Sequence, residues 1–165
     1  MAYTDRVIGR LVAKAREKSW WRNTLVVIVA DHGRRVIPLD DQAPFKDADA
    51  VFRIPMLWLG GAVTARDSVV DEIGSQVDLT PTLLDMAGIT PAVPYRWGRS
   101  LLDRVAEPYA YYGFETGFGL VTPGGNLVYD PRAGRFVTRT GNPTPADERL
   151  GRALMQLTYQ DYLDR

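Results

Sequence analysis

The sequence predicts an α/β fold, and three features of the 165-residue chain carry that prediction. Residues 25–30 form an uninterrupted apolar run, which is typical of a strand covered on both faces, as parallel strands in α/β proteins are. Apolar residues recur at helical spacing before this run and again after Asp78. Beyond Tyr109, short apolar stretches alternate with turn residues, which indicates an antiparallel β-meander.

The first half of the chain predicts two helices and two or three strands. The first helix is expected to begin at Thr4, a suitable N-cap, and to end near Ser19. Its apolar residues share one face: Val7, Ile8, Leu11, Val12 and Ala15. After the strand at residues 25–30, a polar loop over residues 34–51 is long enough to be functional, for instance as a lid. A second apolar strand follows at residues 54–59, and a short one is expected near residues 68–71.

The second predicted helix covers residues 78–87 and has signals at both ends. Asp78 and Thr80 are candidates for its N-terminal cap, Pro81 suits the first turn, and Gly88 suits the C-terminal end. Asp78 and Thr80 also have side chains that could contact a substrate. We assign them to capping because they stand where a helix begins.

The second half of the chain predicts four strands and a terminal helix. The strands are expected at residues 109–114, 119–122, 126–129 and 135–138. The last helix, at residues 145–163, has an apolar face that is expected to pack on the sheet. Five aromatic residues suggest either a ligand-stacking platform or a core, and aromatic residues in strands favour the core. They are Tyr109, Tyr111, Tyr112, Phe114 and Phe118.

Composition excludes several classes of protein. The 20 basic and 20 acidic residues balance, so no chain-wide field favours nucleic acid. The absence of cysteine excludes disulfides, thiolate metal sites and a cysteine nucleophile. No apolar run is long enough to span a membrane, and no signal-peptide core is present. The length fits a single domain over residues 1–165, with an α/β part at residues 1–90 and the meander and terminal helix at residues 105–165.

Asp31 and His32 are the candidate metal ligands. They follow directly on the apolar strand, at the carboxyl end where open α/β sheets gather their ligands. A carboxylate and an imidazole suit Mn or Zn better than Ca or Mg, which prefer oxygen ligands throughout. The alternative is that Asp31 caps the following turn and His32, the single histidine of the chain, is an ordinary loop residue.

Four stretches resemble, in order and separation, the C-terminal half of the sulfatase and alkaline-phosphatase superfamily: NTLVVIVADHG, FRIPMLWLGG, QVDLTPTLLDMAGI and WGRSLL. Two later stretches are most similar to the branch of lipoteichoic-acid-synthase-like sulfatases and phosphoglycerol transferases: YYGFETGFGLVTPGGNLVYD and GRALMQLTYQDYL. The resemblance covers nearly the whole chain. It implies a partial alkaline-phosphatase-like sheet with flanking helices, then the meander and the terminal helix.

The resemblance also implies a chemistry. In the superfamily the acid-histidine pair, here Asp31 and His32, binds the active-site cation. A threonine, serine or formylglycine attacks a sulfate or phosphate ester. That nucleophile and at least one acidic ligand belong to a segment that precedes the resembling part. Many members have a further histidine or lysine in the next loop; this chain offers Arg34, Arg35 and Lys46 there, as anion-binding groups or as solvated charges.

Three interpretations follow. The chain is the C-terminal fragment of a metal-dependent sulfuric- or phosphoric-ester hydrolase or phosphoglycerol transferase, inactive alone; or a non-catalytic binding or complementing module with the same fold; or an unrelated α/β domain with a coincidental Asp-His pair. The first, favoured interpretation implies a location on the periplasmic or extracellular side of the membrane. It also implies an exposed sheet edge through which the chain self-associates.

Overall fold

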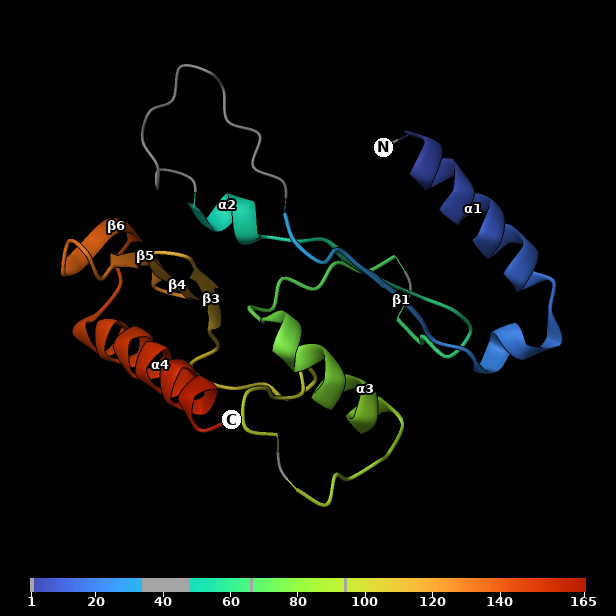
Figure 1. The fold of residues 1–165 in the computed structure, drawn as a ribbon. Helices are drawn as coiled ribbons and strands as arrows, with labels where there is room; N and C mark the ends of the chain where they lie inside the picture. The colour runs from blue at the N-terminus through green and yellow to red at the C-terminus, as the bar shows by residue number, and fades with distance from the viewer. Residues whose placement is uncertain (1, 34–47, 66, 94) are drawn as a thin grey trace. The chain divides into compact units, whose positions relative to one another are not determined.

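The computed structural model describes residues 2–33, 48–65, 67–93 and 95–165 (Figure 1). The chain divides into two compact units, the first from residues 1–34 and 53–70 and the second from residues 35–52 and 71–165. Both helices and sheets are present, so the predicted α/β class is confirmed. The described strands form two separate antiparallel sheets. None of the described helices is long and apolar enough to cross a bilayer.

The first unit contains two helical segments and a two-stranded sheet. In chain order its elements are α1 (Ala2–Arg16), the 3-10 helix η1 (Ser19–Asn23), β1 (Val26–Val29) and β2 (Met56–Leu59). The expected N-cap was wrong, because α1 begins at Ala2 and Thr4 lies inside it. The short strand expected at residues 68–71 is also absent, since the described residues there have no regular structure.

β1 and β2 pair antiparallel, with Val26 opposite Leu59. The parallel arrangement expected from the apolar run is therefore wrong for the strand pair described. Gly60 permits the close approach that ends the pair: its φ is +112°, and a Cβ there would lie 2.0 Å from the carbonyl oxygen of Thr24. A sheet of only two strands is marginally stable in water.

The second unit contains the meander, three α-helices and a 3-10 helix. In chain order its elements are α2 (Ala48–Phe52), the 3-10 helix η2 (Gln76–Asp78), α3 (Leu79–Met86), β3 (Ala110–Phe114), β4 (Gly117–Thr122), β5 (Gly125–Asp130), β6 (Arg135–Gly141) and α4 (Pro145–Leu163). The strand order β3-β4-β5-β6, all antiparallel, confirms the predicted meander. The terminal helix has the predicted bounds, because Thr144 and Asp147 form a capping box and Pro145 opens the first turn.

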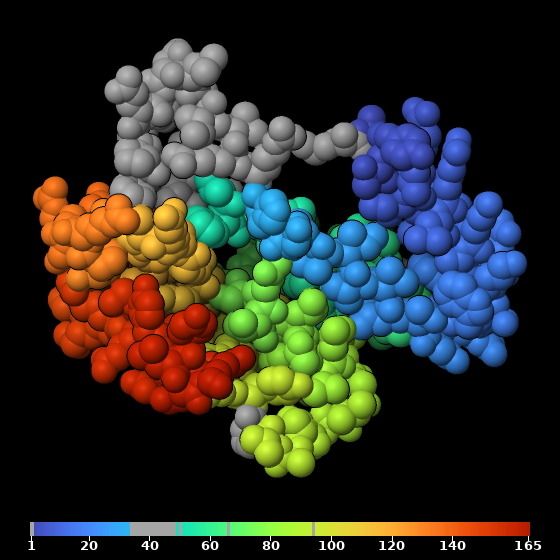
Figure 2. Space-filling model, in the orientation of Figure 1, coloured from blue at the N-terminus to red at the C-terminus, as the bar shows by residue number. Residues whose placement is uncertain are grey.

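One face of this sheet and α4 enclose the core of the second unit. Its buried apolar residues are Phe118, Leu120, Leu127 and Tyr129. Gly151 lets the helix approach closely, since a Cβ at this position would lie 2.5 Å from the Phe118 ring. α4 and β6 lie against each other (Figure 2), and the guanidinium of Arg152 stacks over Phe136 at 5.2 Å. The aromatic residues of β3 and β4 thus serve packing, as predicted.

The opposite face of the sheet receives α2. The Phe52 ring stacks on Tyr112 with 4.2 Å between ring centroids and 18° between ring planes. α2 lies where the sequence predicted a loop, so the prediction was wrong for residues 48–51. Residues 34–47 of the predicted loop lie outside the described residues.

Candidate functional site

Asp31 and His32 lie just beyond the end of β1, and local hydrogen bonds hold both side chains. Oδ1 of Asp31 accepts the backbone N–H of His32 at 2.9 Å. Nδ1 of His32 lies 2.9 Å from the carbonyl oxygen of Gly33. A carbonyl oxygen only accepts, so Nδ1 carries the hydrogen, and Nε2 is the ring nitrogen that can offer a lone pair to a cation.

The lone pair of Nε2 and the second carboxylate oxygen of Asp31 can bind one cation. The distance from Nε2 of His32 to Oδ2 of Asp31 is 3.6 Å. Two ligands of a tetrahedral zinc ion, each at about 2.1 Å, stand about 3.4 Å apart. A backbone carbonyl that fixes the distal ring nitrogen is also the usual support of a metal-binding histidine. The donor set and its spacing therefore fit Zn or Mn.

The pair is only part of a metal site. Both side chains are exposed, Asp31 to 88% and His32 to 79%. In the part of the chain that the structure describes, no group of three or more acidic, histidine or cysteine side chains could enclose a cation. Arg34, Arg35 and Lys46, the predicted anion-binding residues, lie outside the described residues.

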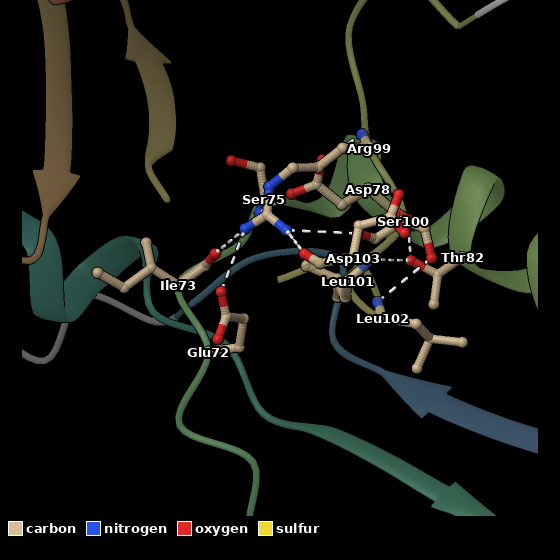
Figure 3. Close-up of polar contacts among 10 residues, drawn as sticks. All are labelled: Glu72, Ile73, Ser75, Asp78, Thr82, Arg99, Ser100, Leu101, Leu102 and Asp103. Carbon is tan, nitrogen blue, oxygen red and sulfur yellow. Dashed lines mark hydrogen bonds and ion pairs between the residues drawn. The ribbon is translucent and has the colours of Figure 1, made fainter. Parts of the chain in front are cut away.

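A second polar cluster, in the second unit, proves to be structural (Figure 3). The carboxylate of Asp78 is 5% exposed and accepts two backbone N–H groups, from Ser75 at 2.7 Å and from Arg99 at 3.0 Å. Thr82 is fully buried; its hydroxyl donates to the Asp78 carbonyl at 2.5 Å and accepts the Leu101 N–H at 2.9 Å. These bonds join α3 to the segment that follows Gly98.

The guanidinium of Arg99 is engaged with backbone and carboxylate oxygens. It donates to the carbonyl oxygens of Ile73 at 2.9 Å and Asp103 at 3.1 Å, and lies 3.5 Å from the Glu72 carboxylate. These partners hold the guanidinium within the cluster, so Arg99 is not a substrate-binding candidate.

The sequence predicted the role of Asp78 only in part. Asp78 does cap a helix, but it occupies position N3 of a capping box at the start of η2, whose N-cap residue is Ser75. Thr80 is exposed and lies outside that box. Ser75, Thr82 and Arg99 were missed. The Ser-x-x-Asp spacing of residues 75–78 was the signal available for the first of them.

Tyr112 is the titratable residue with the largest pKa displacement among the described residues. Burial raises the pKa of its phenol well above 10.0, the Asp49 carboxylate adds to the increase, and the amide of Asn126 opposes it. Oη of Tyr112 and Oδ1 of Asn126 are nevertheless both buried without a hydrogen bond of good geometry, so we attribute the Asn126 effect to proximity.

The Tyr112→Phe variant is expected to lose less stability in alkali than the wild type. Because folding raises the pKa of Tyr112, its contribution is complete below pH 10.0 and is lost as the pH rises through the folded-state pKa. Urea titrations between about pH 9 and about pH 12 measure the difference. Tyr3→Phe, at a residue 80% exposed, is the control and should follow the wild type. Equal pH dependence in all three proteins would contradict the assignment.

Comparison with known proteins identifies relatives of this chain. A family model described as Sulfatase matches residues 1–89. Arylsulfatase K of Canis lupus familiaris is 31% identical over 108 residues, which are 66% of this chain and 20% of the relative. Phosphoglycerol transferase I of Xanthomonas euvesicatoria is 34% identical over 108 residues, 65% of this chain and 14% of the relative.

A third relative has the same partial coverage. The delta 4,5-hexuronate-2-O-sulfatase of Bacteroides thetaiotaomicron is 32% identical over 128 residues, 67% of this chain and 25% of the relative. The chain therefore spans a quarter or less of the relatives it matches.

Proposed function

The chain belongs to the sulfatase family, and on that premise we propose that it is the C-terminal fragment of a metal-dependent ester hydrolase or phosphoglycerol transferase. Its contribution to the active site is the Asp31–His32 pair. The observation that carries this proposal is the 3.6 Å spacing of Oδ2 and Nε2, with the Gly33 carbonyl fixing the tautomer. The phosphoglycerol transferase relative supports an activity in the lipoteichoic-acid-synthase-like branch, on phosphate as well as sulfate esters.

The chain's own groups hold and orient the cation. Asp31 supplies a negative oxygen and His32 a neutral nitrogen, which together favour Mn or Zn. When bound, such a cation neutralises charge on the ester oxygens. Arg34, Arg35 and Lys46 follow the pair in sequence, and we assign them to the anionic group of the substrate. The nucleophile and the remaining ligands come from sequence that this chain does not contain.

A non-catalytic module is the second candidate. This candidate is favoured because Asp31 and His32 offer two ligands, and no acidic, histidine or cysteine side chain joins them as a third among the described residues. The DNA next to the coding sequence distinguishes the two candidates: an in-frame segment that encodes an acidic ligand and a Thr, Ser or Cys nucleophile supports the enzyme. Its absence supports a binding or complementing module.

The isolated chain is expected to bind Mn²⁺ or Zn²⁺ weakly, and Asp31→Ala is expected to abolish this binding. Two protein ligands leave at least half of the coordination sphere to water, and removing the carboxylate leaves one protein ligand. Isothermal titration calorimetry measures both proteins. Asp71→Ala, which removes an exposed carboxylate outside the pair, is the control and should bind as the wild type does. Tight binding that survives Asp31→Ala would place the cation elsewhere.

Alone, the chain is also expected to self-associate through its two-stranded sheet. Both strands are short and apolar, and several of their side chains are exposed: Val29 to 36%, Met56 to 40% and Leu57 to 52%. Open apolar edges of this kind pair with other chains.

A further inference from the structure

Two arginines of the second unit, Arg139 on β6 and Arg152 on α4, hold their guanidinium groups against the same aromatic side chains. Cζ of Arg152 lies 4.3 Å from the ring centroid of Tyr129 and 5.2 Å from that of Phe136. Cζ of Arg139 also lies 5.2 Å from the Phe136 centroid. Because both guanidinium groups contact the Phe136 ring, a strand and a helix bring two positive charges to one place.

A β-bulge brings Arg139 to this place. The register of β5 and β6 shifts between Val128 and Tyr129, and Val137 is the extra residue on β6. In a regular strand, side chains three residues apart lie on opposite faces of the sheet. The extra residue reverses this alternation, so Phe136 and Arg139 share one face. The bulge thus aims a charged side chain at the side of the sheet on which α4 packs.

The guanidinium of Arg152 keeps its N–H donors free of carboxylates. Glu148 precedes Arg152 by one helical turn, a spacing at which such residues pair. Its carboxylate binds Arg139 instead, with Oε1 2.6 Å from Nη1. In the described part of the chain, no carboxylate forms an ion pair with Arg152. The two arginines and Glu148 together retain one net positive charge.

The aromatic rings position both arginines without occupying their hydrogen-bond donors. A guanidinium has five N–H donors, and a cation–π contact leaves them able to bind an oxygen ligand. Glu148 occupies one donor nitrogen of Arg139, whose side chain is 48% exposed. Arg152 is exposed as well. Since the rings already restrict both side chains, less rotamer entropy is lost when an anion binds.

The arrangement of the two guanidinium groups favours one shape of anion. A carboxylate is planar and offers a single pair of oxygens to one guanidinium. A phosphate or sulfate group is tetrahedral, so it can offer different oxygens to guanidinium groups that approach from different directions. Arg139 approaches from the sheet and Arg152 from the helix.

We propose that Arg139 and Arg152 form a binding site for a tetrahedral oxyanion, the phosphate or sulfate group of a free ion or of an ester. The site uses neither Asp31 nor His32, and it lies in the second unit. It therefore goes beyond the proposed function and stands or fails separately from it.

Nuclear magnetic resonance of the full chain tests the site. The Nε–Hε signals of the arginines are followed while sodium phosphate, sodium sulfate, methyl phosphate or sodium acetate is added at constant ionic strength. Phosphate and sulfate are expected to shift the signals of Arg139 and Arg152 with one common, millimolar dissociation constant. Acetate is expected to bind at least about tenfold more weakly, because it cannot serve both guanidinium groups.

Substitutions separate ligand binding from packing. Arg152→Met keeps an apolar side chain over the aromatic rings but removes the N–H donors, and Arg139→Gln removes the second charge. Each is expected to weaken phosphate binding by about tenfold or more. Arg165→Gln is the control, since it removes the same charge at the other end of α4, where Arg165 pairs with Asp161 at 2.8 Å. This variant should bind phosphate as the wild type does.

Glu148→Gln gives a change of the opposite sign. It removes the negative charge beside Arg139 and retains an amide oxygen that can accept the same N–H, so phosphate should bind about threefold more tightly. A purely structural role of the arginines would not produce this gain. Circular dichroism and urea unfolding confirm that each variant is folded.

Three results would overturn the inference. The first is unchanged phosphate affinity in folded Arg152→Met and Arg139→Gln. The second is acetate binding as tightly as phosphate, and the third is a shift of the Arg165 signal equal to those of Arg139 and Arg152. Equal affinity for methyl phosphate and inorganic phosphate would support the site and assign it to esters, whereas binding of inorganic phosphate alone would support it as a site for the free ion.

Discussion

The isolated chain is expected to show no turnover of aryl sulfate or aryl phosphate esters with Mn²⁺ or Zn²⁺, and the complex formed by co-expression with an upstream half from a close relative is expected to be active. Positioning and electrostatic stabilisation act only when nucleophile, cation and substrate are held together. In the proposed function, the chain contributes two ligands to that arrangement, Asp31 and His32, whose Oδ2 and Nε2 lie 3.6 Å apart. We expect at least about a 10³-fold difference in turnover between the complex and the chain alone.

Substitutions in the complex link this activity to the pair. His32→Ala is expected to remove turnover, because it removes Nε2 as a ligand. Asp71→Ala should leave turnover unchanged, since Asp71 is exposed and lies outside the pair. Metal-dependent turnover by the chain alone, lost with His32→Ala, would overturn the fragment interpretation and require a nucleophile within these 165 residues.

Phe118→Ala is expected to reduce the stability of the second unit by about 3–5 kcal/mol. The Phe118 side chain is fully buried, its ring centroid lies 5.3 Å from that of Tyr129 and 5.5 Å from that of Tyr111, and α4 packs on it through Gly151. Truncation therefore leaves a cavity between sheet and helix. Urea unfolding followed by circular dichroism measures the loss.

Tyr162→Ala is the matched control for this truncation. Tyr162 belongs to the same unit, on α4, but is 77% exposed, so its removal should change the unfolding free energy by no more than about 0.5 kcal/mol. A loss below about 1 kcal/mol for Phe118→Ala would mean that the core refills the cavity and that α4 depends on other contacts.

The elements that could be predicted are those whose signals are local. α4 matched its predicted bounds because Thr144 and Pro145 specify its start within a few residues. The meander followed from turn residues between its strands, such as Pro123 and Gly124 between β4 and β5. The pairing of β1 was not predictable in this way, since an apolar run is compatible with a parallel or an antiparallel neighbour and the partner lies about thirty residues away.

The candidate site shows the same division. Asp31 and His32 are adjacent, so the geometry that brings Oδ2 and Nε2 to 3.6 Å is local, and the pair could be proposed from sequence. The bond from the Arg99 N–H to Asp78 spans 21 residues, and no periodic pattern marks it. From the sequence, Asp78 could therefore be predicted only as a helix-capping residue. Its bond with the Arg99 N–H depends on how the segment after Gly98 packs against α3.

The strand order of the meander also bears on how the chain acquires its structure during synthesis. Each of β3 to β6 pairs with its neighbour in sequence, so contact order within this sheet is low and its folding should be rapid. β1 cannot pair until β2 has been synthesised, and the first paired residue of β2 is Met56. Because the N-terminal part leaves the ribosome first, β1 spends that interval unpaired while the fast-folding sheet has yet to be made. A chaperone that binds nascent apolar strands would meet β1 before any other strand of this chain.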